Sequence, residues 1–232
     1  MDYSVIVPVY HESTGINSLI DHVRSLAGQR GQKAEIIVVD GSPLAETVSA
    51  IKRDDVKKMV SSPGRGTQMN AGAEAASGEV LVFLHADTRL PPSAFSLVSS
   101  LLEDPAVCGG AFDLGIDDDR KFYRVIERMA NLRSRLTRIP YGDQTIFLRS
   151  CVFSSIGGYR NIPIFEDVDL MRRIKAAGLQ LGFIDSPVVT SARRWQREGI
   201  LRTTFRNWLI LAGYFAGFSP GFLERFYRRE AS

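Results

Sequence analysis

Largely apolar runs alternate with segments of helical spacing along the first hundred residues, and this alternation restricts the fold more than any other feature. The apolar runs are Ser4–Val9, Ala34–Val39 and Glu79–Leu84, and a weaker one spans Val56–Ser62. Helical spacing, helix-start prolines or alanine-rich composition predict helices over four segments: Ile16–Leu26, Pro43–Arg53, Gly66–Ala76 and Pro92–Leu102. Strands that are apolar on both faces and alternate with helices are typical of a parallel sheet covered on both sides, so we expect a doubly wound α/β fold.

Polar side chains follow three of these predicted strands at the point where each strand ends. Tyr10 and Glu12 follow the first strand, Asp40 ends the second, and His85 and Asp87 follow Glu79–Leu84. In open α/β sheets, ligands bind outside the carboxyl ends of the strands. A single acid at such a position often serves only as a helix cap or turn former. Three ends that converge on one edge favour a ligand site.

Composition and missing motifs exclude several classes of protein. The net charge of +3 is too small to indicate a nucleic-acid partner, and we expect none. No GxGxxG motif follows the first strand, which disfavours binding of a nicotinamide or flavin dinucleotide. The absence of GxxxxGK[ST] excludes a P-loop. Cys108 and Cys151 form no CxxC pair, and no basic leader precedes the first strand. We therefore expect a cytoplasmic protein with reduced thiols.

Five segments, in this order, resemble family 2 glycosyltransferases, which have the GT-A fold. They are Val5–Glu12, Ile36–Ser42, Arg65–Gly72, Phe83–Asp87 and Phe165–Leu170, and the resemblance covers about residues 3–195. It implies an inverting transfer of one sugar from a nucleotide-diphosphate sugar, such as a UDP- or GDP-sugar, with Mn²⁺ or Mg²⁺ as cofactor. A narrower resemblance, to a small bacterial subgroup associated with arsenosugar or radical-SAM gene clusters, implies a small acceptor.

The resemblance also implies roles for residues of the first half. Asp87 matches the last acid of the family's Asp-x-Asp motif and is the expected metal ligand. His85 occupies the first position of the motif. It would be a second metal ligand, a contact to the ribose or a phosphate, or a packing residue. The expected nucleotide-binding residues are Pro8, Tyr10, Glu12, Asp40, Arg65 and Asp87. A guanidinium and a helix N-terminus both favour the negative charge of phosphates; the weaker alternative is that Arg65 is a solvent-exposed turn residue.

The second half carries the expected chemistry. An acceptor hydroxyl needs a base as it attacks the sugar. Asp167 matches the second acid of the family's Glu-Asp motif and is the expected base, while Glu166 would orient it or bind the acceptor. Taken alone, the pair could be helix N-terminal charge. Asp143 and Gln144 are expected on the acceptor side. Arg194 is expected to bind the donor diphosphate and Trp195 to stack or pack, although Ser191 replaces the glutamine of a Gln-x-x-Arg-Trp motif.

The chain is expected to form one GT-A domain over residues 1–200, with a nucleotide-binding half (1–105), an acceptor half (106–200) and a helical tail (201–232). Asn207–Leu223 contains no charged residue but is shorter than the roughly 20 apolar residues that a membrane span needs. Three roles are compatible with the tail: an interfacial helix at the inner face of the membrane, a helix that closes the acceptor pocket, or a homodimer contact. An interfacial tail would favour a lipid acceptor over a small molecule.

Two other functions are alternatives to a glycosyltransferase. A non-catalytic nucleotide-sugar-binding protein of the same fold would explain His85 and Ser191, which depart from the family pattern. A nucleotidyltransferase of related fold would need a glycine-rich basic loop after the first strand. The residues from Tyr10 to Gly15 do not provide such a loop.

Overall fold

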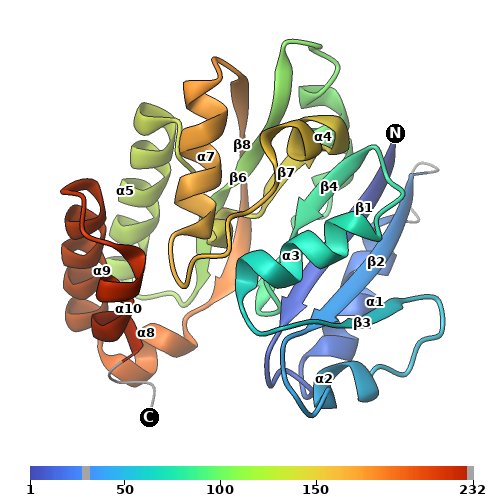
Figure 1. Ribbon diagram of the computed structural model, residues 1–232, viewed down its shortest axis with the longest axis horizontal. Helices are drawn as coiled ribbons and strands as arrows, with labels where there is room; N and C mark the ends of the chain where they lie inside the picture. Colours follow the sequence, from blue (N-terminus) through green and yellow to red (C-terminus); the bar gives the residue numbers. More distant parts are fainter. Residues whose placement is uncertain (28–31, 229–232) are drawn as a thin grey trace.

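The computed structural model describes residues 1–27 and 32–228. Within them, eight strands form one sheet in the order β3-β2-β1-β4-β7-β6-β8-β5 (Figure 1). The strands are β1 (Asp2–Val9), β2 (Lys33–Asp40), β3 (Lys57–Val60), β4 (Val80–Phe83), β5 (Thr88–Arg89), β6 (Val107–Asp117), β7 (Ile146–Arg149) and β8 (Gln180–Ser191). Four of the seven pairings are parallel and three are antiparallel. The mostly parallel α/β sheet predicted from the sequence is confirmed.

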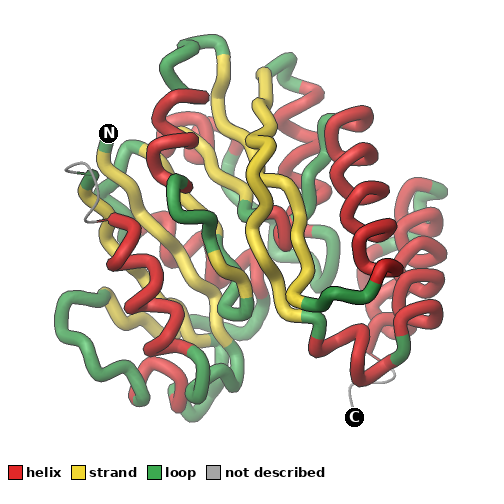
Figure 2. Tube along the Cα trace, turned by 180° about the vertical axis from the view of Figure 1, so that it is seen from behind, coloured by secondary structure: helices red, strands yellow, loops and turns green. Residues whose placement is uncertain are grey.

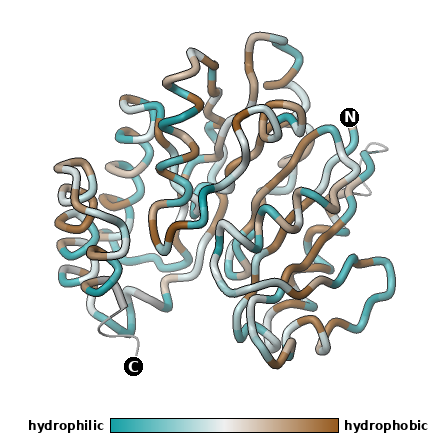
Figure 3. The backbone as a smooth tube through the Cα atoms, in the orientation of Figure 1, coloured by the Kyte–Doolittle hydropathy of each residue, from teal (hydrophilic) through white to brown (hydrophobic). Residues whose placement is uncertain are grey.

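Two layers of helices cover the sheet because successive residues of each strand face opposite sides. On β1, Val5, Val7 and Val9 contribute to one core, whereas Ile6 belongs to the other. The first core lies under α1 (Ile16–Ala27), α2 (Glu46–Ser49) and α4 (Ala94–Leu101). The second lies under α3 (Arg65–Glu74), α6 (Ser150–Ile156) and α7 (Glu166–Ala176), of which α3 and α7 stand in front of the sheet in Figure 1. Figure 3 shows the apolar residues concentrated along the inner strands.

The helix predicted over Pro43–Arg53 is wrong in extent, because only Glu46–Ser49 is helical. Ala45, the residue before it, lies in the left-handed region with a φ of 51°. The Asp40 carboxylate accepts hydrogen bonds from the backbone N–H groups of Thr47 and Val48 at 2.9 and 3.2 Å. This side chain shapes the segment into a turn with one short helical piece, which proline-based helix signals do not reveal.

The remaining helices gather at the end of the molecule away from β3, as Figures 1 and 2 both show. They are α5 (Lys121–Thr137), α8 (Arg193–Glu198), α9 (Ile200–Phe215) and α10 (Pro220–Arg228). A short 3₁₀ helix, η2 (Gly142–Gln144), connects α5 to β7. In the part of the chain that the structure describes, no helix has both the length and the hydropathy required to cross a bilayer.

Candidate active site

The carboxyl ends of β1 and β2 are joined by a side chain from α3. The amide nitrogen of Gln68 donates hydrogen bonds to the carbonyl oxygens of Val9 and Val39, each at 2.8 Å. Gly41 permits this approach, since a Cβ there would meet Gln68 atoms at 2.9 Å. Gln68 therefore fixes the edge of the sheet at which the predicted ligand residues lie.

Asp40 lies at this edge with its carboxylate inside the protein. Besides binding the first turn of α2, it accepts a hydrogen bond from the backbone N–H of Ser42 at 2.8 Å, and the residue is fully buried. A carboxylate with three backbone donors holds a turn in place. In this structure Asp40 shapes the rim, and its predicted contact with a nucleotide remains a prediction.

The residues after β1 form the outer part of the rim. Tyr10 is exposed, Pro8 is half-buried, and the ring of Tyr10 packs edge-on against His11 with the centroids 4.3 Å apart. His11 has a φ of 57° and contacts the Glu46 carboxylate. The backbone N–H of Glu12 donates to the hydroxyl of Thr47 at 3.0 Å, which attaches this segment to α2.

The turn after β4 presents His85 and Asp87 together. A hydrogen bond of 3.1 Å from the Thr88 N–H to the His85 carbonyl closes this turn. Asp87 is exposed, whereas His85 is half-buried. Burial and then the Arg65 guanidinium lower the pKa of His85 to about 3, so the imidazole is neutral at physiological pH and has a lone pair for a ligand.

Glu166 and Asp167 occupy the first turn of α7, after Phe165, whose φ is 66°. The backbone N–H of Gly142, at the start of η2, donates to the Asp167 carboxylate at 2.6 Å. A Cβ at Gly142 would meet the His85 ring nitrogen Nε2 at 2.9 Å and the Asp167 carboxylate at 3.4 Å. His85 and Asp167, which are 82 positions apart in the sequence, therefore lie on either side of one glycine.

Several acidic side chains lie near this glycine. Burial, and then the carboxylates of Asp167 and Asp87, raise the pKa of Asp143 to about 6, although the Arg133 and Arg65 guanidinium groups oppose the shift. Burial and the neighbouring Asp167 also raise the pKa of Glu166. Carboxylates with raised pKa values in a shared site are typical of active sites.

Gln144, predicted on the acceptor side, is fully buried and holds local structure. Its carbonyl oxygen accepts from the Ser134 hydroxyl at 2.5 Å and from the Tyr141 N–H at 3.2 Å. Its amide nitrogen donates to the Phe112 carbonyl at 3.2 Å. These contacts anchor η2 to β6 and α5. Gln144 thus positions its neighbour Asp143, and an acceptor contact of its own remains a prediction.

A guanidinium from α8 also reaches the rim, although the sequence pattern had singled out the next residue. A nitrogen of Arg193 lies 3.6 Å from the Glu12 carboxylate and 4.0 Å from the Asp87 carboxylate. The side chain of Arg194 lies outside the described part of the chain. Trp195 packs beside Tyr123 with the ring centroids 6.1 Å apart, which fits the packing alternative of its prediction.

The turn after β4 carries two side chains of the kind that bind divalent ions. Among residues 1–27 and 32–228, no three His, Cys, Asp or Glu side chains are close enough to form a metal cage. Magnesium and manganese sites on phosphate substrates commonly use one or two carboxylates, with phosphate oxygens and waters as the other ligands. The exposed Asp87 carboxylate and the neutral His85 imidazole suit such an ion.

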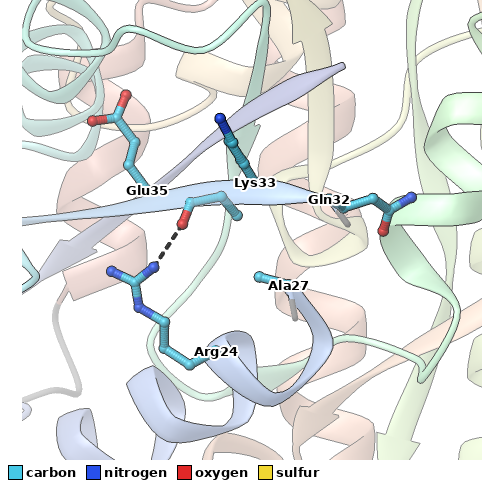
Figure 4. Close-up of a pocket in the computed structure, with 6 residues that line it drawn as sticks. Arg24, Ala27, Gln32, Lys33 and Glu35 are labelled. Carbon is cyan, nitrogen blue, oxygen red and sulfur yellow. Dashed lines mark hydrogen bonds between the residues drawn. The ribbon is translucent and has the colours of Figure 1, made fainter. Parts of the chain in front are cut away.

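A hollow of about 440 Å³ lies elsewhere, at the amino end of β2 (Figure 4). Arg24 of α1 donates a hydrogen bond of 2.7 Å to the Ala34 carbonyl across it. The candidate site lies at the carboxyl end of the same strand, so this hollow is not part of it.

Besides Arg193, the sequence motifs missed three contributors to the site. Gln68 stands within the matched segment Arg65–Gly72, but a glutamine on a helix does not reveal which carbonyl groups it binds. Gly142 acts through its backbone N–H and its lack of a Cβ. Arg133 stacks on the ring of Tyr141, with its guanidinium carbon 3.3 Å from the ring centroid, and its charge acts on Asp143. Only the position of Gly142 next to Asp143 could have drawn attention to it.

The architecture is that of GT-A glycosyltransferases, as solved structures show. The chain superimposes on TarS 1–349 from S. aureus in complex with UDP with a TM-score of 0.61, at 16% identity, covering 82% of this chain and 60% of that one. The mannosyltransferase PcManGT from Pyrobaculum calidifontis, in complex with GDP-Man and Mn²⁺, gives a TM-score of 0.60 at 21% identity and covers 98% of this chain and 68% of that one. At these identities the likeness establishes the fold alone.

Residues 4–159 match the model of glycosyl transferase family 2, and the chain belongs to that family. It is 31% identical over 170 residues to a dolichol-phosphate mannosyltransferase of Saccharomyces cerevisiae, which covers 65% of this chain. An undecaprenyl-phosphate 4-deoxy-4-formamido-L-arabinose transferase of Yersinia pestis is 26% identical over 156 residues, or 63% of this chain. The chain spans 64% and 47%, respectively, of the lengths of these two relatives.

Proposed function

We propose that the protein is an inverting glycosyltransferase that moves one sugar from a nucleotide-diphosphate sugar to an acceptor hydroxyl. The observation that carries this proposal is the meeting of His85 and Asp167 at Gly142, next to the turn that presents Asp87. This arrangement supports a metal site and a base on the same edge of the sheet. Family membership supports a sugar transfer at this edge.

Asp87 and His85 would hold the divalent ion, which would neutralise charge on the donor diphosphate. Arg193 lies at the same rim and would move from Glu12 and Asp87 toward the phosphates as they arrive. Exposed Tyr10 is placed to cover a nucleotide base, and Pro8, Glu12 and Arg65 would line its ribose and phosphates. Arg194 would add a second guanidinium on the diphosphate. Mn²⁺ in a neighbour of the same fold supports a metal here.

Asp167 would take the proton of the acceptor hydroxyl as that oxygen attacks the anomeric carbon. A new carbon–oxygen bond forms on one face of the sugar while the bond to the diphosphate breaks on the other, which inverts the centre. The Gly142 N–H holds one carboxylate oxygen of Asp167 in place. Glu166 and Asp143, whose pKa values are raised, would bind the acceptor as hydrogen-bond partners.

A second candidate is transfer to a lipid phosphate at the cytoplasmic face of a membrane. Both relatives are named for a polyprenyl phosphate, which favours it. A phosphate monoester loses its second proton near pH 6 and needs no base at neutral pH. The Asp167→Asn variant would then retain transfer to a lipid phosphate while losing transfer to hydroxyl acceptors. The small acceptor implied by the narrower bacterial resemblance remains an alternative.

Thermal unfolding with a panel of UDP-, GDP- and dTDP-sugars, with and without Mn²⁺, tests the donor. A ligand at 100 times its dissociation constant stabilises a protein by about 2.7 kcal/mol, which such a scan detects. We expect one donor class to stabilise the protein only with Mn²⁺. On longer incubation, slow hydrolysis of that donor should release nucleoside diphosphate. Stabilisation without release would instead support a non-catalytic nucleotide-sugar-binding protein.

A further inference from the structure

Helix α5 turns an apolar stripe away from the protein. Its exposed apolar residues recur at intervals of three and four: Phe122, Val125, Met129, Leu132 and Leu136. The opposite face carries Tyr123, Glu127 and Ser134, which are buried against the sheet. Surface helices normally direct their apolar stripe to the core, and an exposed stripe of this kind marks a surface that binds something.

Helices α9 and α10 extend the exposed apolar surface with aromatic side chains. On α9, Thr203 and Ile210 are buried, while Phe205, Trp208, Leu209 and Phe215 are exposed. Phe218, in the connection before α10, and Phe222 and Phe226 on α10 form a column of rings, with successive ring centroids 5.8 and 5.3 Å apart. Figures 1 and 2 place α9 and α10 next to α5 at one end of the molecule. We call the exposed apolar residues of these helices the apolar helix surface.

Positive charge is concentrated on the same helices. Their sequences carry four net positive charges on α5, two on α9 and one on α10. The whole chain carries only +3, so the remaining residues carry four net negative charges. Arg135 and Arg206 are paired with Asp113 and Glu198, and the other basic side chains still make α5, α9 and α10 more basic than the rest of the chain.

We propose that the apolar helix surface docks on the headgroup region of an anionic lipid bilayer. Helices that lie in this region combine an apolar face rich in Trp, Phe and Leu with flanking Lys and Arg, which anionic lipids attract. Trp208 and the phenylalanine column would enter the bilayer surface, while Arg202 and Arg225 would lie at the level of the phosphates. Two copies of the surface would instead bring like charges together, which disfavours a homodimer contact.

Two contacts connect this surface to the candidate active site. The ring of Tyr214 on α9 packs on Phe165, which directly precedes Glu166 and Asp167, with the centroids 4.9 Å apart. Arg133 on α5 stacks on Tyr141, next to Gly142. A chain docked in this way would hold its acceptor side close to the membrane. The docking itself requires no sugar transfer, so its test is independent of the proposed reaction.

Vesicle flotation of the full chain, without donor or metal, tests the proposal. We expect the protein to float with phosphatidylglycerol–phosphatidylcholine vesicles and to stay behind with pure phosphatidylcholine. Binding should weaken as salt rises, because salt screens the attraction between basic side chains and lipid headgroups. In a Trp195→Phe background, Trp208 is the remaining tryptophan, and its emission should shift to the blue on binding.

Paired substitutions assign the binding to named residues. The double variant Leu132→Ser/Leu136→Ser and the single variant Trp208→Ser should each lower vesicle partitioning by about tenfold. Val60→Ser, an exposed apolar residue on β3, is the matched control and should bind as the unmodified chain does. The altered side chains are exposed, and circular dichroism of each variant would verify that it folds.

Absence of flotation with anionic vesicles at low salt would overturn the proposal. Equal loss of binding in Val60→Ser would also contradict it, since the effect would then not belong to the apolar helix surface. A dimer in solution that Leu132→Ser/Leu136→Ser or Trp208→Ser dissociates, without any vesicle binding, would assign the surface to a second copy of the chain.

Discussion

The backbone N–H of Gly142 donates a hydrogen bond of 2.6 Å to the carboxylate of Asp167. This bond joins the connection between α5 and β7 to the first turn of α7. It fixes the carboxylate that we propose as the base, while the absence of a side chain on Gly142 leaves room for His85. The candidate base and the candidate metal-binding turn are thus held in one geometry.

Asp167→Asn should lower sugar transfer to a hydroxyl acceptor about 1,000-fold, within the range that general-base catalysis contributes. The amide oxygen of asparagine still accepts the Gly142 N–H, and only the bond from the Val168 N–H to the other oxygen is lost, so the fold and donor binding should persist. Initial rates and donor-induced thermal shifts, measured on the same preparation, check both halves of this expectation. Normal turnover in the variant would show that another group takes the proton.

Gly142→Ala should impair the site while the fold stays intact. The added methyl group would approach the His85 ring at 2.9 Å and displace it, so we expect Mn²⁺-dependent donor binding to weaken about tenfold. Gly221→Ala, at a position where a Cβ meets nothing within 4 Å, is the matched control. Titration calorimetry with donor and metal compares the two variants, and equal affinities would argue against the role given to Gly142.

Asp143→Asn should change stability in a pH-dependent way. The folded-state pKa of about 6 lies above the ordinary value of about 4, so the stability that Asp143 contributes is present below pH 4 and lost as pH rises through 6. The variant should therefore gain about 2 kcal/mol at pH 8 relative to the unmodified chain and little at pH 4. Urea unfolding at both pH values measures this difference, and an equal gain at both would refute the assignment.

Gln68→Leu should destabilise the protein by about 2 kcal/mol, because it removes two hydrogen bonds to buried carbonyl groups. Gln180→Leu, at an exposed position on β8, should stay within about 0.5 kcal/mol of the unmodified chain. Denaturant unfolding of both variants makes the comparison. Equal stabilities would mean that the strand ends do not depend on Gln68.

The strands and the rim of the sheet were predictable because each apolar run is local in the sequence. The same runs place Asp40, His85 and Asp87 at the carboxyl ends of their strands without further information. The roles of Asp40 and Gln144 within the fold were not predictable, since a buried carboxylate or amide that binds backbone groups has the same sequence signature as one that binds a ligand.

The contacts that complete the site could not be predicted from the sequence because they join residues that are far apart in the chain. Gly142 meets Asp167 across 25 residues, and Arg193 reaches Glu12 across most of the chain. Such pairs depend on how distant elements pack. Likewise, the spacing along α5 predicts an amphipathic helix, but only the packing of Tyr123 and Glu127 shows that its apolar stripe faces outward.

Anomalous diffraction at the manganese edge, from crystals grown with Mn²⁺ and the donor found by the thermal panel, would locate the metal relative to the donor. We expect one manganese peak that contacts both the Asp87 carboxylate and the donor diphosphate, with the anomeric carbon of the sugar facing Asp167. A diphosphate bound away from Asp87, with no manganese between them, would contradict it.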